Sequence, residues 1–465
     1  MWIPKPGKQE KRPLGIPTML DRAMQALFLL GLEPVVESRS DPRSYGFRPD
    51  RSSADALTEL HHLLSPKVGA EWVLEGDIKG FFDNINHDWL CQTAPMNQTV
   101  LRKWLKAGVI DKGQLAETKA GTPQGGIISP CLANMTLNGL ETQLRQYFAS
   151  KLPINELSKR KLQVVRYADD FVITGASKEL LENEVMPWVE NFLAERGVAL
   201  SKAKTRITSI YEGFDFLGWN FRKYVHKAPR KKPTLLIKPS RANTSAFYRK
   251  VKGIVRQSGA MTQGDLISRL NPVLKGWAQY HQPASAKKVF GRLDDLIYWR
   301  LMRWALRRHH NESRKRITRK YFHAIGNRTW VFATPTVNQK GERTYKAIYN
   351  LASTPIIRLK RLPKDYTPYD RQNELAWEKL RVARMSHKLR YRNDVIKIYS
   401  RQKGLCALCG GPLTQETGWH DHHIIRRTDG GSDTLGNRAL VHPVCHNRIH
   451  SGSSMPELPY SGLLW

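Results

Sequence analysis

Runs of β-branched and aromatic residues alternate with helical apolar periodicity in the first half of the chain. Residues 73–78 and 164–174 are such runs, and they predict buried strands. Residues 186–196 repeat their apolar positions at helical spacing and are followed by Gly197, which predicts a helix with a glycine stop. This mixture of short strands and helices favours an α+β fold.

The second half is helical at first. A basic, proline-containing stretch at 224–232 indicates a linker or an exposed loop, and residues 241–310 have a helical pattern. Within 292–308 the apolar positions recur at helical spacing and predict a buried stripe. The members of this stripe are Leu293, Leu296, Ile297, Leu301 and Trp304. A separate face of the same helix carries three arginines, and it is either solvated or in contact with nucleic acid. These arginines are Arg300, Arg303 and Arg307.

Basic clusters and aromatic residues are interleaved from residue 314 to residue 403. Basic side chains suit contact with phosphates, and aromatic rings suit stacking on bases. The aromatic residues are Trp330, Tyr345, Tyr366, Tyr369 and Trp377. The mixture predicts a nucleic-acid-binding segment, although none of its residues carries visible chemistry.

Charge narrows the choice of partner. The 465 residues include 75 Lys and Arg against 41 Asp and Glu, a formal net charge of +34. Nucleic acid is the expected partner, because each neutralised phosphate releases counterions. A membrane surface is the rival, but the best apolar stretch, residues 23–32, is short and predicts a buried helix. The first residues also lack the apolar middle of a signal peptide. We expect no membrane partner and a protein that stays where nucleic acid is.

The five cysteines indicate a metal site in a reducing compartment. Cys406, Cys409 and Cys445 lie in one short window, which argues against a disulfide framework. Cys91 and Cys131 stand among apolar neighbours and are expected in the core.

Three aspartates interrupt the two predicted strands. Asp77 lies in the first, and Asp169 and Asp170 lie in the middle of the second. Burying unpaired carboxylates would cost roughly several kcal/mol each, so we expect a tight turn between Tyr167 and Phe171 that exposes the pair. Two Mg²⁺ ions about 4 Å apart need such bridging carboxylates for phosphoryl transfer. By itself, the Asp-Asp pair is also compatible with a solvated turn.

A series of short blocks in chain order identifies the first part of the chain. The blocks are Lys-Arg-Pro-Leu-Gly-Ile-Pro-Thr (11–18), Ser-Tyr-Gly-Phe-Arg-Pro (44–49), Asp-Ile-Lys-Gly-Phe-Phe-Asp-Asn-Ile (77–85), Gly-Thr-Pro-Gln-Gly-Gly-Ile-Ile-Ser-Pro (121–130), Tyr-Ala-Asp-Asp (167–170), Leu-Ser-Lys-Ala-Lys-Thr (200–205) and Gly-Phe-Asp-Phe-Leu-Gly-Trp (213–219). Over roughly residues 3–222 this order resembles the reverse transcriptases encoded by group II introns. The resemblance implies a right-hand polymerase fold with fingers, palm and thumb.

The resemblance also implies roles for individual residues. Asp77, Asp169 and Asp170 would bind two Mg²⁺ ions, with Asp170 as the lesser ligand and Ile78 offering at most its main-chain carbonyl. Phe82 would collide with the 2′-hydroxyl of a ribonucleotide and so select deoxynucleotides, the alternative being a core phenylalanine.

Other positions match substrate-contacting residues of the family. Lys5 and Arg12 resemble finger residues that clamp the triphosphate. Gln124 lies in a glycine-containing block that lets the backbone approach the nucleotide or the template. Lys204 matches a lysine proposed to protonate the leaving pyrophosphate, and is otherwise a surface lysine. Support of the primer strand is expected from Phe216, Leu217 and Gly218.

Two ligand pairs near the C-terminal end predict a zinc site. Cys406-x₂-Cys409 and His442-x₂-Cys445 are separated by 32 residues, which is typical of a structural Zn²⁺ ion. A zinc site alone does not need the other polar residues nearby. These are Asp421, His422, His423, Asn437, His446 and His450. The last two histidines, four residues apart, share a helical face and could hold a second metal ion.

Residues 400–452 resemble the HNH nucleases, which have a ββα-metal core. The resemblance implies that His423 is the general base and that Asn437 tethers the hairpin and orients it. The ligands of the catalytic divalent metal would be His422, His446 and His450. The family usually has cysteine in place of His442 and often glutamate near Asp421, so it stays open whether a carboxylate or His422 meets the metal. A purely structural zinc domain is the alternative.

The expected domains follow from these resemblances. Fingers and palm occupy 1–222, a helical thumb or maturase domain 223–312, a basic DNA-binding segment 313–390 and the HNH zinc domain 391–465. Related enzymes usually carry some tens of residues before the Ile-Pro-Lys-Pro block, which stands here at 3–6. We therefore expect this N-terminal extension to be truncated, supplied as a separate chain or lost.

The leading hypothesis is a reverse transcriptase and maturase that binds group II intron RNA and assists its splicing. It would nick target DNA with its HNH domain and extend the 3′-end with dNTPs along the intron RNA; a homodimer is possible for such a protein. The alternatives are a maturase that acts only as an RNA-binding splicing factor, and a DNA nuclease that uses the polymerase fold for binding alone.

Overall fold

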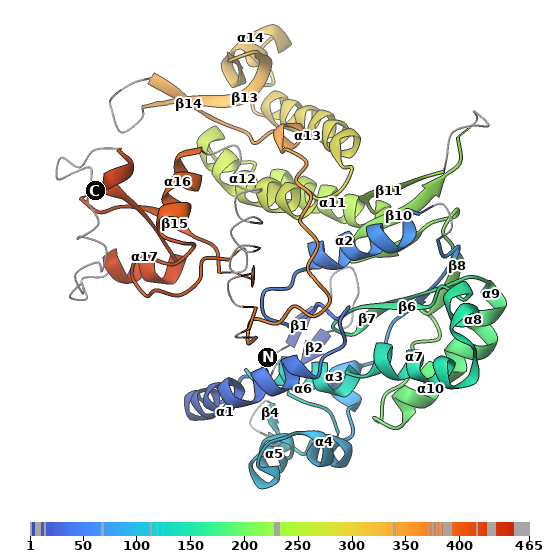
Figure 1. Cartoon of the computed structure of the whole chain (residues 1–465). Helices are drawn as coiled ribbons and strands as arrows, with labels where there is room; N and C mark the ends of the chain where they lie inside the picture. Colours follow the sequence, from blue (N-terminus) through green and yellow to red (C-terminus); the bar gives the residue numbers. More distant parts are fainter. Residues whose placement is uncertain are drawn as a thin grey trace. The chain divides into compact units, whose positions relative to one another are not determined.

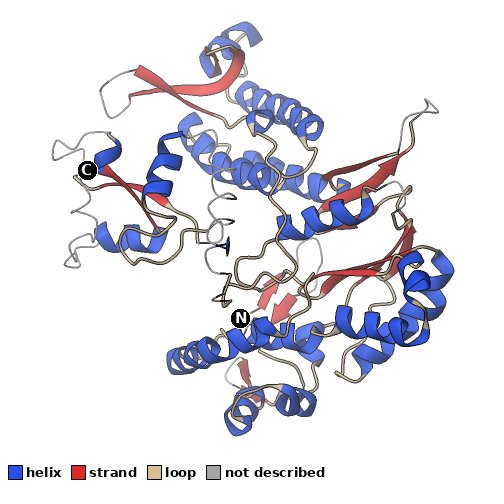
Figure 2. Cartoon of the chain, viewed as in Figure 1, coloured by secondary structure: helices blue, strands red, loops and turns tan. Residues whose placement is uncertain are grey.

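The computed structural model describes residues 2–4, 11–13, 15–66, 69–111, 114–118, 120–123, 125–226, 233–337, 341, 343–370, 372–373, 376–377, 380, 384, 393–414, 417–425 and 434–450. The chain divides into two compact units, of which the first comprises residues 1–63, 72–207 and 359–465. The second comprises residues 64–71 and 208–358. Figure 1 labels many of the elements of both units, and Figure 2 colours them by type.

A four-stranded sheet organises the first unit. Its strand order is β6 (Gln163–Tyr167), β7 (Asp170–Gly175), β3 (Trp72–Gly76) and β8 (Arg206–Ser209). Strand β7 pairs antiparallel with both β6 and β3. The strand predicted at 73–78 is found as β3, but it ends at Gly76, so that Asp77 lies just beyond the strand and not in it. The run at 164–174 forms two strands joined by the expected tight turn.

Helices and two short hairpins complete this part of the first unit. The helices are α1 (Met19–Ser38), α2 (Ser53–Leu64), α3 (Phe81–Asn84), α4 (His87–Thr93), α5 (Gln98–Leu105), α6 (Ser129–Leu137), α7 (Leu140–Lys151), α8 (Ile154–Lys159), α9 (Lys178–Leu180), the π-helix η1 (Leu181–Val185) and α10 (Met186–Ala194). The hairpins are β1 (Trp2–Pro4) with β2 (Lys11–Pro13), and β4 (Val109–Asp111) with β5 (Gln114–Ala116). The helix predicted at 186–196 is confirmed as α10, and Gly197 follows it with a φ of +76°.

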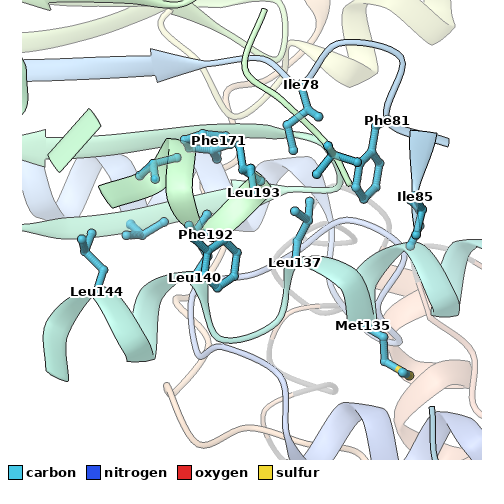
Figure 3. Close-up of a cluster of buried hydrophobic side chains, with 14 of the residues drawn as sticks. Ile78, Phe81, Ile85, Met135, Leu137, Leu140, Leu144, Phe171, Phe192 and Leu193 are labelled. Carbon is cyan, nitrogen blue, oxygen red and sulfur yellow. The ribbon is translucent and has the colours of Figure 1, made fainter. Parts of the chain in front are cut away.

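The main core lies against one face of the sheet. Figure 3 shows Phe171 of β7 near Phe192 of α10 and Leu140 of α7, and all three side chains are almost fully buried. Cys91 and Cys131 are buried in the same core, as the sequence predicts. Because such interiors are packed at crystal-like density, this core fixes the register of the strands and the place of every side chain at their ends.

Helix α1 differs from expectation. The stretch 23–32 predicts a buried helix, but Leu27 and Leu30 are 62% and 75% exposed. Only the side that carries Gln25 and Leu32 is buried. The prediction is wrong because apolar residues recur around the whole helix while one side alone contacts the core. Within the described residues, no helix has the length and apolar character that crossing a membrane requires.

The second unit joins a small sheet to a helical bundle and a second sheet. The first sheet has the order β11 (Thr234–Pro239), β10 (Trp219–Tyr224), β9 (Phe214–Phe216). The helices are α11 (Arg241–Gln257), α12 (Gln263–Tyr280), α13 (Lys287–Arg307), α14 (Arg314–Tyr321) and the short η2 (Leu351–Ser353). The second sheet has the order β12 (Phe322–Ile325), β13 (Arg328–Val337), β14 (Arg343–Ala347).

The helical prediction for 241–310 is confirmed, and the stripe on α13 forms most of the core of this bundle. Leu293, Ile297 and Leu301 are buried, and the indole N–H of Trp304, also buried, donates to the carbonyl of Ser258 at 2.8 Å. Leu296 is the exception at 36% exposed. The stripe is therefore correct except for this member, which lies at the edge of the buried face.

Part of the predicted basic segment packs as a core in the first unit. Tyr366 and Trp377 are buried, with their ring centroids 5.0 Å apart in an edge-to-face arrangement. These two rings are not available to stack on bases, which corrects that part of the prediction. Trp330, Tyr345 and Tyr369 are 58%, 43% and 43% exposed and stay candidates for stacking.

The last described part has a β-β-α order. A helix, α16 (Asn393–Arg401), precedes β15 (His420–His423), η4 (Leu435–Asn437), β16 (Arg438–Val441) and α17 (Pro443–His450). Strands β15 and β16 pair antiparallel, so that His420 is opposite Val441 and His423 is opposite Arg438. Val395, Ile398 and Leu440 form the centre of a small separate core.

Candidate active sites

The three aspartates meet at one end of the four-stranded sheet of the first unit. Gly76 pairs with Phe171, so Asp77, the next residue after β3, is placed across from Asp170, the first residue of β7. Asp169 lies in the two-residue turn between Tyr167 and Asp170, where Ala168 takes a φ of +56°. Directly opposed residues in such a ladder have Cβ atoms about 5 Å apart. The sheet therefore brings the three carboxylates together at the turn, where they are half-buried.

The carboxylates also interact electrostatically. Burial, and then the charges of Asp169 and Asp77, raise the pKa of Asp170 to about 6, while Lys204 opposes the shift. Nearby like charges disfavour the ionised form of a carboxyl group. A set of oxygen ligands held close together against their own repulsion fits a hard divalent cation such as Mg²⁺.

Lys204 contacts Asp77 directly. Its Nζ donates to both carboxylate oxygens of Asp77, at 2.8 and 2.7 Å. The loop that carries it is fixed by two backbone hydrogen bonds, from Ser201 N–H to the Asp77 carbonyl and from Lys79 N–H to the Ala199 carbonyl. The ammonium group therefore neutralises part of the carboxylate cluster, a contact that the sequence did not predict.

A buried arginine supports the turn between β6 and β7. Arg166 donates to Asn134 Oδ1 at 3.1 Å, to Asn138 Oδ1 at 2.9 Å and to the Ala168 carbonyl at 3.3 Å. Burial lowers the pKa of its guanidinium to about 10. Asn134 in turn donates to the carbonyl of Gly46, at 2.7 Å. Sequence reasoning missed this network, although a charged residue inside an apolar run was its visible signal.

Gly46 allows the 44–49 block to approach the hairpin. A Cβ atom at Gly46 would lie 2.3 Å from the backbone nitrogen of Ala168, so only glycine fits there. The next residue, Phe47, is 52% exposed and has a φ of +57°, which is strained for a bulky side chain. Its ring centroid lies 6.3 Å from that of Phe82, edge to face. The 44–49 block thus places Phe47 beside Phe82, the residue predicted to exclude ribonucleotides.

Phe82 itself is half-buried and held by the 121–130 block. The backbone N–H of Thr122 donates to the Phe82 carbonyl at 2.7 Å. A Cβ at Gly121 would lie 2.4 Å from the same carbonyl oxygen. Gln124 and Lys5 lie outside the described residues, as does the side chain of Arg12, whose backbone pairs with Ile3.

The predicted primer-contacting residues form a tight turn in the second unit. Phe216 pairs with Trp219, and between them Leu217 and Gly218 have φ values of +49° and +78°. The hydroxyl of Tyr280 donates to the Leu217 carbonyl at 2.8 Å, and the Tyr280 ring stacks on Trp219. The turn is therefore firmly fixed, while its role toward a primer stays a prediction.

Four ligand atoms converge in the C-terminal module. Those of Cys406, Cys409, His442 and Cys445 all lie within 4.8 Å of one another. His442 Nδ1 is 3.3 Å from Cys409 Sγ, while its Nε2 is 3.0 Å from the Pro412 carbonyl. A hydrogen bond from Nε2–H to that carbonyl leaves Nδ1 free as a ligand, as in many metal-binding histidines. Three sulfurs and one imidazole fit a closed tetrahedral Zn²⁺ site.

Strand alternation decides which residues face helix α17. The ring centroid of His446 lies 4.9 Å from that of His420 and 5.3 Å from that of His422. Asp421 points the other way and forms an ion pair with Arg438, which also pairs with Asp394 at 2.6 Å. His422 therefore lies beside His446 and the carboxylate does not. Sequence reasoning passed over His420, although its two-residue spacing from His422 was the signal.

Asn437 makes the tether that the resemblance implies. Its Nδ2 donates to the Ile425 carbonyl at 3.0 Å, and its Oδ1 accepts from the Ile425 N–H at 2.8 Å. These bonds hold the chain just after His423, the last residue of β15. The side chain of His450 lies outside the described residues.

Comparison with protein families decides the assignment. Residues 3–221 match the model for reverse transcriptase (RNA-dependent DNA polymerase), residues 244–322 the group II intron maturase-specific domain and residues 406–452 the HNH endonuclease. Together these matches make the chain similar to the group II intron-encoded proteins. This protein carries a reverse transcriptase domain, a maturase domain and an HNH domain in that order, as the sequence blocks predict.

Two curated relatives illustrate the similarity. Protein YkfC of Escherichia coli is 34% identical over 250 residues, which cover 47% of this chain and 65% of YkfC. The group II intron-encoded protein LtrA of Lactococcus lactis is 32% identical over 283 residues, which cover 48% of this chain and 46% of LtrA. The chain thus spans about two thirds and about half of these relatives. Among solved structures, a telomerase of Candida tropicalis aligns over 47% of this chain and 45% of its own, with 15% identity and a TM-score of 0.33.

Proposed function

We propose that this protein is an RNA-directed DNA polymerase that copies group II intron RNA. The observation that carries the proposal is the register of β3 against β7, which sets Asp77 across from Asp170 with Asp169 in the adjoining turn. Bound Mg²⁺ would supply the positive charge that stabilises the attacking and leaving oxygens. The three aspartates would hold two such ions.

The other residues of the site would bind and select the substrate. Phe82, with Phe47 beside it, would exclude the 2′-hydroxyl and so favour dNTPs. Lys204 would leave Asp77 when metal binds and donate a proton toward pyrophosphate. Lys5, Arg12 and Gln124 stay candidates for contact with the triphosphate or the template.

The C-terminal module would nick the target DNA. In it, His423 would act as the general base, oriented through the Asn437 tether, and His422, His446 and His450 would hold a divalent metal ion. The Cys406, Cys409, His442 and Cys445 set would hold Zn²⁺ and stabilise the module. Nicking would supply the 3′-hydroxyl for target-primed synthesis, and the maturase domain would bind the intron RNA and assist its splicing.

Primer extension on an RNA template tests the polymerase assignment. The variant Asp77→Asn should lose extension by at least about a thousandfold, because an amide cannot replace a bridging carboxylate. Asp88→Asn, the same change at an exposed carboxylate of α4, should extend like the parent. Extension by Asp77→Asn at the parental rate would refute the polymerase. Absent extension by the parent together with retained RNA binding would instead support a maturase that acts only as a splicing factor.

A further inference from the structure

An arginine-lined pocket lies in the second unit, on the face of α13 whose arginines are expected to be either solvated or in contact with nucleic acid. Its volume is about 150 Å³, and it opens between the end of α11 and the last turns of α13. Five arginines and one tryptophan line most of it. They are Arg256, Arg300, Arg303, Trp304, Arg307 and Arg308. No lining residue is acidic.

Two of these residues build the pocket. Arg308 donates from Nη1 to the carbonyls of Gly259 and Met261, at 2.6 and 2.8 Å. Its guanidinium carbon lies 4.7 Å from the ring centroid of Trp304. The Trp304 indole is fixed in turn by its bond to Ser258. The wall is therefore rigid before any ligand arrives, which lowers the entropic cost of binding.

The other four arginines are Arg256, Arg300, Arg303 and Arg307. Among the described residues, no carboxylate lies within ion-pair distance of any of them. Elsewhere the chain pairs its structural arginines closely, as with Arg48 and Glu37. Four unpaired cations around one concavity repel one another and focus a positive potential into it. An anionic ligand removes this repulsion.

The geometry favours phosphate groups. Guanidinium forks bind phosphate oxygens in pairs, and their weak hydration makes them suited to the role. Arg300, Arg303 and Arg307 extend over about 10 Å of helix, at a rise of 1.5 Å per residue. The pocket can hold about five water molecules, a space comparable to one phosphate group with its five heavy atoms. One group therefore fits inside while neighbouring groups meet the rim.

We propose that this pocket binds a phosphodiester group of RNA, with the flanking arginines holding the adjacent phosphates. The inference rests on the proposed function, because the pocket lies within the maturase-specific match at 244–322 and RNA is the polyanion that such a domain would meet. It adds a defined anchoring point to that function. The pocket fixes one position of the RNA backbone by shape and charge without reading a base.

The salt dependence of binding tests this proposal. The full chain carrying Arg300→Gln, Arg303→Gln and Arg307→Gln is titrated with a labelled RNA hairpin at several salt concentrations. A matched control carries Arg249→Gln, Arg269→Gln and Arg292→Gln, which remove the same charge from exposed helix positions outside the pocket. The pocket variant should bind at least about tenfold more weakly at low salt, and the slope of log K against log salt should fall by about two to three. The control should lose less than half of that slope.

Further measurements separate the possible outcomes. Thermal unfolding of the pocket variant should match the parent or improve, because repulsion is relieved. A variant with lysines at the same three positions should bind with intermediate affinity.

Equal losses of RNA affinity in the pocket and control variants would overturn the inference. So would binding of inorganic phosphate in the pocket if the three substitutions leave the salt dependence of RNA binding unchanged. An equal loss for a DNA hairpin of the same sequence would overturn the choice of RNA. Asp77→Asn should lose primer extension while keeping the parental salt slope for the hairpin, so failure of the pocket is distinguishable from failure of the polymerase.

Discussion

Glu59 holds residues 359–370 against the rest of the first unit, and removing its charge should release them. Its carboxylate is 3% exposed and accepts from Arg361 Nε at 2.5 Å, Arg361 Nη2 at 2.8 Å and Arg43 Nε at 2.8 Å. Burial alone would raise the pKa of Glu59, but the hydrogen bonds and charges of Arg361 and Arg43 hold it below its ordinary value. We therefore predict that Glu59→Gln destabilises the contact strongly.

The size of the effect follows from the partners left behind. Breaking a buried ion pair costs about 3–5 kcal/mol. Arg43 keeps its ion pair with Glu141, and the side chain of Arg361 is 34% exposed and can rehydrate, so the lower value, about 3 kcal/mol, is expected. Arg361→Gln leaves Glu59 paired with Arg43 and should cost less, about 1–2 kcal/mol.

Hydrogen exchange measured on peptides from 359–370 reports the release directly. Exchange protection there should fall in the order parent, Arg361→Gln, Glu59→Gln, while peptides from the second unit keep theirs. Glu190→Gln, an exposed change on α10, should leave all protection within about 0.5 kcal/mol of the parent. Because the folded pKa of Glu59 is lowered, its contribution is present above the unfolded pKa near 4.5 and is lost as the pH falls through the folded pKa. A change below 1 kcal/mol in Glu59→Gln, or a larger effect from Arg361→Gln, would refute this account.

Three further predictions concern the two sites. Phe82→Val should raise the incorporation of ribonucleotides relative to deoxynucleotides by about 10–200-fold in primer extension, and an unchanged ratio would reject Phe82 as the gate. Cys409→Ser should lower the zinc content measured on the purified chain and abolish DNA nicking while primer extension persists, because the metal-binding free energy of about 10–16 kcal/mol exceeds the stability expected of so small a module; nicking at parental rate would argue against the zinc site. Asp170→Asn should stabilise the metal-free chain by roughly 1–3 kcal/mol at pH 8, since the raised pKa of Asp170 means that its ionisation costs folding energy above pH 6. That difference should vanish near pH 3, and Mg²⁺ should narrow it by stabilising the parent more than the variant.

One part of the polymerase site was predictable because a single segment combines two adjacent carboxylates with an apolar run. Asp169 and Asp170 stand in an apolar run that cannot bury both charges, so the turn between Tyr167 and Phe171 followed from sequence alone. Asp77 needed the family blocks, because nothing local says that β3 pairs with β7. Register is a property of two strands together, and no single strand determines it.

Contacts between distant residues were the part that the sequence could not supply. The aromatic residues Tyr366 and Trp377 look alike in sequence to the exposed Trp330, and only tertiary packing buries the first two. The same holds for charge. Arg361 and Arg300 both stand among basic neighbours, yet one is paired with a buried glutamate and the other lines a pocket without an acid. Whether an arginine serves the fold or a ligand depends on where the carboxylates lie.

The nuclease module shows how strand geometry settles a question that motif comparison left open. Adjacent residues of β15 point to opposite faces, so Asp421 and His422 cannot both reach a metal ion beside His446. Asp421 is already paired with Arg438, whose other partner is Asp394, and moving Asp421 would remove one of the two carboxylates that pair with this arginine.

His423 lies on the same face of β15 as Asp421 as long as the strand continues. His423 is the last residue of β15. Two residues later, the side chain of Asn437 forms hydrogen bonds with the backbone N–H and carbonyl of Ile425. A bend at this junction is what would turn His423 toward the metal side, so the Asn437 tether should matter most for the orientation of the base and little for the zinc site. Asn437→Ala should therefore abolish nicking while the zinc content stays at the parental level, and loss of both together would refute this division of labour.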